Sequence, residues 1–245
     1  MRIILSPAKK MRLDDGLPWV DYPVFLNRTQ QLMKVLQGMD ASHLKQLWKC
    51  NEQITRLNVT RLERMDLQKN LTPAILAYEG IAYQHMAPDV FTDRELGYVQ
   101  EHLRILSGFY GILRPFDGVT PYRLEMQAKL SVDGAKDLYA FWGDSLARAL
   151  LNETDCIVNL ASKEYSAAVS KYVPDSVRFL TCIFGEMRNG KVIEKAVMCK
   201  MARGEMVRYM AQNQIKNAED VKSFDLLDFH YAQEHSNAEN FTFLR

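Results

Sequence analysis

The sequence contains short apolar runs of strand length that stop abruptly at turn-forming or polar residues. Arg2–Leu5 is followed at once by Ser6-Pro7, and Cys156–Leu160 is followed by Ala161-Ser162. Short apolar runs bounded by turn residues are typical of buried strands. Ala74–Tyr78 has the same character, so we predict a third buried strand there. The chain therefore combines buried strands with the helical segments described below.

An Asn-Gly pair gives the most specific local prediction. Val177–Met187 and Lys191–Met198 are strand-like runs, and the turn between them contains Asn189-Gly190. Asn-Gly accommodates the positive φ angles that a tight hairpin turn requires. The sequence therefore predicts an antiparallel hairpin near residues 177–199.

Helical spacing of apolar residues predicts three successive helices near residues 24–37, 41–49 and 52–65. Asp40 and Asn51 precede the second and third of them and are suitable N-caps. Further helices are expected near 81–86, after Thr92 or Asp93, and after Asp137, and an edge strand is expected at Phe241–Leu244.

The stretch from 103 to 126 concentrates arginines, glycines, prolines and tyrosines in the middle of the chain. Gly108 and Gly111 interrupt the apolar helical spacing there, and glycine costs about 1 kcal/mol relative to alanine inside a helix. We therefore predict a helix, a tight glycine-bounded turn and a short helical turn near residues 96–115. A turn that exposes backbone N–H groups beside arginines can bind an anion. A helix-loop corner that caps the core explains the same residues equally well.

Composition limits the classes of partner. Lys and Arg number 31 against 30 Asp and Glu, a formal net charge of +1, so a polyanion would have to be held by a local patch. The four cysteines lie far apart and lack a CxxC pair, which indicates neither a zinc site nor a disulfide framework. His230 and His235 lack the i, i+4 spacing of a helical metal pair. We expect no metal, no cofactor, no membrane span and a cytoplasmic protein.

Polar side chains follow several predicted strands. In α/β proteins ligands gather at the carboxyl ends of strands, so these side chains are candidates for one anion-binding or nucleic-acid-binding site. Lys200 and Arg203 are expected where the predicted hairpin ends and a helix begins. They are candidates for the site because the helix dipole favours an anion at a helix start. Each residue also has a purely structural explanation; Ser162, for example, would cap a helix. The candidates are Ser6, Lys9, Ser107, Gly108, Gly111, Arg114, Tyr122, Arg123, Asn159, Ser162, Lys200 and Arg203.

Five motifs occur in order along the chain. They are Ser6-Pro7-Ala8-Lys9; the block from Leu103-Arg104 through Leu113-Arg114-Pro115 to Pro121-Tyr122-Arg123-Leu124-Glu125-Met126; Leu138-Tyr139-Ala140-Phe141-Trp142-Gly143; Asn159-Leu160-Ala161-Ser162 with Glu164-Tyr165; and Lys200 with Ala202-Arg203-Gly204. Together these motifs resemble the YaaA family of bacterial peroxide-stress proteins.

The resemblance implies a single YaaA-like domain over residues 1–245, of mixed α/β (α+β) class, with a central, mostly buried mixed sheet, flanking helices and a positively charged cleft. It also implies DNA binding through a helix-hairpin-helix element, for which Gly108–Gly111 is the candidate turn. The implied role is to limit iron-driven oxidative damage.

Three hypotheses follow for function. The first is a DNA-binding stress protein that contacts the phosphate backbone without reading sequence. The second is an enzyme acting on a nucleotide, nucleobase or other phosphorylated metabolite, with Lys9, Glu125 and Tyr165 as catalytic candidates. The third, direct iron binding, has little support because the histidines are scattered. A cavity lined by Lys9, Glu125, Asn159 and Arg203 would favour the enzyme, and an open basic groove would favour the DNA binder.

Overall fold

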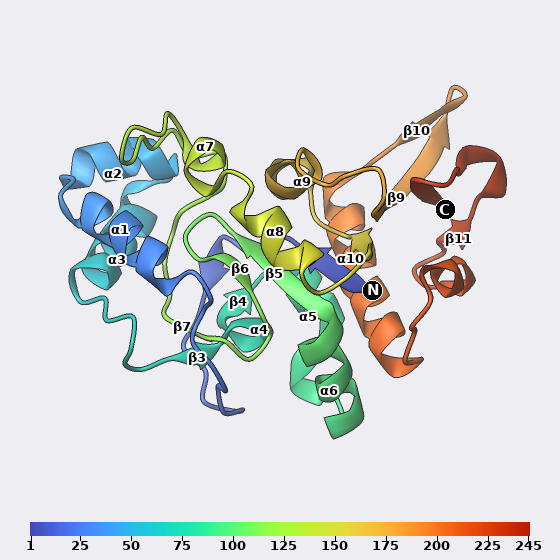
Figure 1. Cartoon of the computed structure of the whole chain (residues 1–245), viewed down its shortest axis with the longest axis horizontal. Helices are drawn as coiled ribbons and strands as arrows, with labels where there is room; N and C mark the ends of the chain where they lie inside the picture. Colours follow the sequence, from blue (N-terminus) through green and yellow to red (C-terminus); the bar gives the residue numbers. More distant parts are fainter.

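An eight-stranded mixed sheet runs through the middle of the molecule (Figure 1). The computed structural model describes residues 1–245. The strand order is β11–β12–β9–β8–β1–β5–β6, with β10 paired to β9. The strands are β1 (Arg2–Leu5), β5 (Leu103–Ser107), β6 (Gly111–Leu113), β8 (Cys156–Asn159), β9 (Arg178–Arg188), β10 (Lys191–Ile193), β11 (His230–Tyr231) and β12 (Asn240–Leu244). The predicted mixed α/β fold with a central mixed sheet is confirmed.

β1 lies between two parallel partners. Ile3 and Leu5 are paired with residues 103 and 105 of β5, while Ile3 and Ile4 are paired with residues 158 and 159 of β8. Ile3, Ile4 and Leu5 are buried. Since a strand that is apolar on both faces needs cover on both sides, this run is suited to the interior of a parallel sheet.

The two faces of β9 are covered to different extents. Leu180, Cys182 and Phe184 are buried on one face, and the Cys199 thiol from α10 (Ala196–Gln212) donates a hydrogen bond to the Phe184 carbonyl oxygen. The alternate residues, including Phe179 and Thr181, stay partly exposed. This second face lies toward α9 (Lys163–Ser170) and is left partly open.

The three helices α1 (Leu26–Gln37), α2 (Ala41–Trp48) and α3 (Glu52–Glu63) form a group at one end of the molecule (Figure 1). The Asp40 carboxylate accepts hydrogen bonds from the backbone N–H groups of Ser42 and His43, and the Asn51 side chain accepts one from Ile54. The predicted helices and both N-caps are therefore confirmed.

The remaining elements connect the sheet to this helical group and to the carboxyl-terminal segment. Thr92 and Asp137 cap the helices predicted after them. The elements are β2 (Lys10–Met11), β3 (Thr72–Pro73), α4 (Ala74–Ala77), β4 (Tyr78–Glu79), α5 (Ile81–Met86), η1 (Pro88–Val90), α6 (Asp93–His102), β7 (Gly118–Val119), α7 (Leu138–Trp142), α8 (Ser145–Leu151), η2 (Ala218–Ser223) and η3 (Gln233–His235).

The buried strand predicted at Ala74–Tyr78 is wrong. Residues 74–77 form the single helical turn α4, and only Tyr78 enters a short strand. The backbone N–H groups of Ala74 and Ile75 donate to the carbonyl oxygens of Asp117 and Pro115. A short apolar run has no period that separates a buried helix from a buried strand, so these distant partners decide the conformation.

The helix-hairpin-helix element predicted near 96–115 is also corrected. α6 is present, but the chain after it enters the sheet as β5 and returns as the antiparallel strand β6. Gly108 lies in the turn between these strands and Gly111 begins β6, so no second helix follows. The apolar residues of 103–107 are buried beside β1, which explains why helical spacing did not determine their structure.

The hairpin of β9 and β10 is confirmed, with Asn189 and Gly190 at φ angles of 49° and 73° in the turn. Its second strand is shorter than predicted, because β10 ends at Ile193 and α10 begins at Ala196. Lys200 and Arg203 therefore lie inside a helix and not at its N-terminus, which removes the helix-dipole argument for an anion beside them.

The strand predicted at Phe241–Leu244 is present as β12, but it is not an edge strand. It lies between β9, to which it is parallel, and the short antiparallel strand β11. The tail folds back at residues 230–231 to cover the outer side of β12, a long-range event that the local sequence does not reveal.

Glu153 joins three arginines that come from separate parts of the chain. Its Oε2 atom accepts hydrogen bonds from Arg2 Nε at 2.8 Å and Arg104 Nε at 2.9 Å, and its Oε1 atom lies 3.3 Å from an Arg114 nitrogen. The Arg104 side chain is 5% exposed. Burial tends to raise the pKa of Glu153, but the hydrogen bonds and charges of the three arginines outweigh burial and lower it. Glu153 therefore neutralises a buried guanidinium.

We expect Glu153→Gln to lower the free energy of unfolding at pH 7 by about 3 kcal/mol, because a buried guanidinium loses its counter-charge. The measurement is urea denaturation monitored by circular dichroism. Glu52→Gln is the matched control: Glu52 is also paired with two cations, Lys45 and Arg56, but is exposed, so its replacement should cost far less. Equal losses in the two variants would contradict the importance of the Glu153 cluster.

Candidate functional site

A cavity of about 400 Å³, here called cavity A, opens where β1 and β8 end. The loops that leave these neighbouring parallel strands form two of its walls. The segments 79–83 and 122–125, together with α10, supply the others. Its polar lining residues are Ser6, Lys9, Lys10, Glu79, Tyr83, Tyr122, Arg123, Glu125, Ser162, Glu164, Tyr165, Lys200 and Arg203.

Ser6 and Ser162 connect the two strand ends. The Ser6 hydroxyl accepts a hydrogen bond from the backbone N–H of Ser162 at 2.9 Å and donates to the Ser162 hydroxyl at 3.2 Å. Ser162 occupies the N-cap position of α9, but its side chain makes no capping hydrogen bond. The predicted helix-capping role of this side chain is therefore wrong, because its hydroxyl is directed to Ser6 across the sheet edge.

Two arginines line cavity A with unsatisfied hydrogen-bond donors. The side chains of Arg123 and Arg203 are 10% and 16% exposed, and the Nε atom of each is buried without a hydrogen-bond partner. Their terminal nitrogens make only long contacts, 3.5 Å to Glu125 and 3.7 Å to Glu194. Buried guanidinium donors are normally satisfied, because an unmade hydrogen bond from a charged group is costly. This arrangement suits an anionic ligand.

Two carboxylates in the same cavity have different environments. Glu125 pairs with Lys9 at 2.8 Å and contacts Arg123. Burial raises the pKa of Glu164 above its ordinary value, and the charge of Glu125 adds to the effect, although a hydrogen bond from the Gln127 backbone N–H opposes it. Neighbouring carboxyl groups in such contrasting environments can divide the roles of proton donor and proton acceptor.

Buried tyrosines form a hydrogen-bonded layer beside cavity A. The Tyr122 hydroxyl lies 2.6 Å from the Ser107 hydroxyl and 2.8 Å from the Tyr78 hydroxyl. Tyr83 donates to the Ser6 carbonyl oxygen. Burial raises the pKa of Tyr122 to about 12 and also raises that of Tyr165. These phenols therefore stay neutral near pH 7 and can serve as hydrogen-bond donors.

The structure brings most of the predicted site residues into one place. The residues that line cavity A come from five distant segments, and they include all three catalytic candidates. The predicted residues that line it are Ser6, Lys9, Tyr122, Arg123, Glu125, Ser162, Tyr165, Lys200 and Arg203.

The turn at 107–111 does not line the cavity. The Ser107 hydroxyl accepts hydrogen bonds from the backbone N–H groups of Phe109 and Tyr110, so these groups are already used inside the protein. The whole turn is buried, and a Cβ added to Gly108 would lie 2.7 Å from the Leu124 carbonyl oxygen. The prediction that Ser107, Gly108 and Gly111 expose N–H groups to an anion is wrong. Glycine is required here for close packing.

Two other predicted residues lie elsewhere. Arg114 reaches the Glu153 cluster and does not line cavity A. Asn159 lines a neighbouring cavity, where its side-chain nitrogen donates to Thr181 and its oxygen accepts from the Ala161 backbone N–H. The buried amide is therefore satisfied, and it connects β8 with β9.

No sequence pattern assigns a separate role to Glu164 or Tyr83. Glu164 was visible beside Tyr165 in one of the motifs, but its pKa shift depends on burial that only the fold creates. Tyr83 lies in a helix with no sequence signal for a site.

The structure contains no group of three or more histidine, cysteine, aspartate or glutamate side chains placed to hold a metal ion, and its four cysteines are free. None of its helices combines the length and apolar character needed to cross a membrane.

We expect Glu125→Gln to lower the pKa of Glu164, because it removes the negative charge that disfavours ionisation of its neighbour. Carboxyl ¹³C titration by NMR measures the shift, with Glu164→Gln used to assign the resonance. Glu101→Gln, an exposed substitution on α6, is the control and should leave the titration unchanged. An unchanged Glu164 pKa in Glu125→Gln would show that the two carboxylates are not coupled.

Known proteins of one family match this chain over nearly its whole length, which includes the segments that line cavity A. The family model described as "Peroxide stress protein YaaA" matches residues 1–235. A UPF0246 protein of Lachnoclostridium phytofermentans is 53% identical over 246 residues, covering 100% of this chain and 96% of the relative. UPF0246 proteins of Pediococcus pentosaceus and Agathobacter rectalis are each 50% identical, covering 100% of this chain and 98% and 99% of the relatives. The chain therefore belongs to the YaaA (UPF0246) family of peroxide stress proteins.

Proposed function

We propose that this peroxide stress protein binds a small phosphorylated metabolite in cavity A and acts on it as an enzyme through general acid–base catalysis. The observation that carries the proposal is the pair of buried Nε atoms of Arg123 and Arg203, which lack partners in a cavity that also contains two carboxylates.

The charge of cavity A supports an anionic ligand. Five cationic side chains line it against three carboxylates. Guanidinium groups match the geometry of phosphate oxygens and can contact them in a bidentate manner. A volume of about 400 Å³ lies in the range of small-molecule sites. The cations are Lys9, Lys10, Arg123, Lys200 and Arg203, and the carboxylates are Glu79, Glu125 and Glu164.

The carboxylates then have separate roles. Glu164, whose pKa is raised, supplies a proton to the substrate, while Glu125 accepts one. Lys9 and Arg123 contact the Glu125 carboxylate directly and hold it in the cavity wall. The phenol of Tyr165, kept neutral by burial, is available as a hydrogen-bond donor.

Arg123→Met should weaken the binding of inorganic phosphate about 10- to 100-fold, because it removes charge-assisted hydrogen bonds worth roughly 1.5–3 kcal/mol. The measurement is isothermal titration calorimetry at fixed ionic strength. Arg148→Met is the matched control, since Arg148 is exposed on α8 and paired with Asp144. Thermal unfolding confirms that the Arg123 variant is folded. Equal phosphate affinity in both variants would overturn the anion site.

DNA binding is a second candidate function, favoured by the lysines beside the cavities. Lys200 lines cavity A and Lys163 lines the neighbouring cavity, and both side chains are exposed and form no ion pair. Free exposed lysines of this kind contact a phosphate backbone without reading sequence. Because the turn at 107–111 is buried, these lysines replace it as the proposed contacts.

A Lys163→Ala, Lys200→Ala double variant should lose about two units from the slope of log affinity against log salt concentration for duplex DNA. Fluorescence anisotropy across a salt series measures this slope. The control is Lys34→Ala with Lys49→Ala, two exposed lysines in the helical group at the end of the molecule. A slope equal to that of the parent protein would remove the proposed lysines from any DNA interface.

A further inference from the structure

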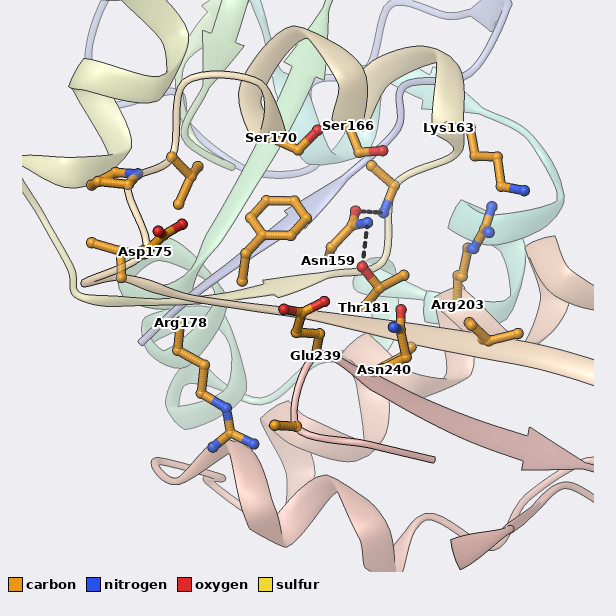
Figure 2. Close-up of a pocket in the computed structure, with 18 of the residues that line it drawn as sticks. Asn159, Lys163, Ser166, Ser170, Asp175, Arg178, Thr181, Arg203, Glu239 and Asn240 are labelled. Carbon is orange, nitrogen blue, oxygen red and sulfur yellow. Dashed lines mark hydrogen bonds between the residues drawn. The ribbon is translucent and has the colours of Figure 1, made fainter. Parts of the chain in front are cut away.

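A second cavity of about 930 Å³, here called cavity B, lies against the partly open face of β9 (Figure 2). Ser166 and Ser170 project into it from α9, and Glu239 and Asn240 face them from the carboxyl-terminal segment. Thr181 lies between these walls on β9. The sheet register places residues 159, 181 and 240 in one row across β8, β9 and β12, which forms a polar floor.

Cavities A and B share a wall. Along the segment 159–164, Asn159, Ala161 and Lys163 line cavity B, while the alternate residues 160, 162 and 164 line cavity A. Arg203 lines both cavities. Its guanidinium, with a buried and unpartnered Nε, is therefore placed at the junction between them.

The two cavities differ in charge. Cavity A has more cations than carboxylates, whereas cavity B has three of each. The remaining polar lining of cavity B consists of hydroxyl and amide groups, and Phe179 adds an aromatic surface. This combination suits the uncharged, hydroxyl-rich part of a ligand. The charged side chains of cavity B are Lys163, Arg178, Arg203, Asp175, Glu194 and Glu239.

Several polar groups in cavity B have no partner inside the protein. Asp175 and Glu239 are exposed residues of the cavity wall whose carboxylates form no ion pair or hydrogen bond within the protein, and the hydroxyl of Ser166 forms none either. Ser166 is nevertheless buried. Carboxylates in such positions accept hydrogen bonds from sugar hydroxyls, as they do from ribose in dinucleotide-binding proteins.

We propose that cavity B holds the sugar, and any base attached to it, of the phosphorylated ligand whose phosphate is bound in cavity A. Arg203 contacts the phosphate at the junction, and Glu239 and Ser166 bind the sugar hydroxyls. The ligand class is then a sugar phosphate or a nucleoside monophosphate. This inference rests on the proposed function of cavity A and assigns the substrate class to it.

The test measures the affinity of the full chain for inorganic phosphate, ribose 5-phosphate and each of the common ribonucleoside 5′-monophosphates by calorimetry. At least one sugar-containing ligand should bind about 10-fold or more tightly than phosphate, as expected for added hydrogen bonds to charged groups. Glu239→Gln and Ser166→Ala should each reduce that affinity about 5- to 10-fold and leave phosphate binding unchanged. Glu234→Gln, exposed in the same carboxyl-terminal segment but outside both cavities, is the matched control.

The outcomes separate the two proposals. Absence of phosphate binding that depends on Arg123 would overturn the function proposed for cavity A. Phosphate binding without a gain from the sugar, or a gain that Glu239→Gln and Ser166→Ala leave intact, would overturn the assignment of cavity B alone. A nucleoside monophosphate that binds more tightly than ribose 5-phosphate would place the base beside Phe179, and the reverse order would identify a sugar phosphate; both support the assignment.

Discussion

The parallel pairing of β1 with β5 and β8 holds the molecule together and determines where its polar groups meet. Hydrogen bonds along β1 align the amino terminus with residues 103–105 and 157–159, which are separated from their β1 partners by 100 residues of chain or more. Since neighbouring parallel strands end at the same edge, the loops after β1 and β8 must lie together. The contact between Ser6 and Ser162 is the direct result, and cavity A is built around it.

Counter-charges then decide which arginines are free to bind a ligand. Arg104 and Arg114 belong to the same central motif as Arg123, but Glu153 pairs with both of them. Arg123 has only a long contact with Glu125, and its Nε atom has no partner. Burial makes this difference important, because an exposed guanidinium would be satisfied by water. The arginines of one motif therefore divide between stabilising the fold and lining a site.

A site divided into a cationic cavity and a polar cavity with equal numbers of cations and carboxylates has a direct chemical interpretation. In the proposed assignment, the cationic part binds a phosphate and the polar part binds hydroxyl groups. The segment 159–164 makes this possible, because alternate residues of one short stretch face the two cavities. The proposed site would connect the response to peroxide stress with the chemistry of a small phosphorylated molecule.

Features that depend on near neighbours in the chain follow from the local sequence. Asp40 and Asn51 capped their helices, Asn189-Gly190 formed its turn, and the apolar Arg2–Leu5 run became a central strand, because each signal acts within a few residues. Motif order along the chain also indicated which polar residues belong together. Contacts between distant segments make 74–77 helical, make 103–113 two strands, and leave the Nε atom of Arg123 without a partner while Glu153 binds Arg104 and Arg114. Those outcomes depend on partners distant in sequence: the carbonyl groups of 115 and 117, the pairing with β1, and the carboxylate of Glu153.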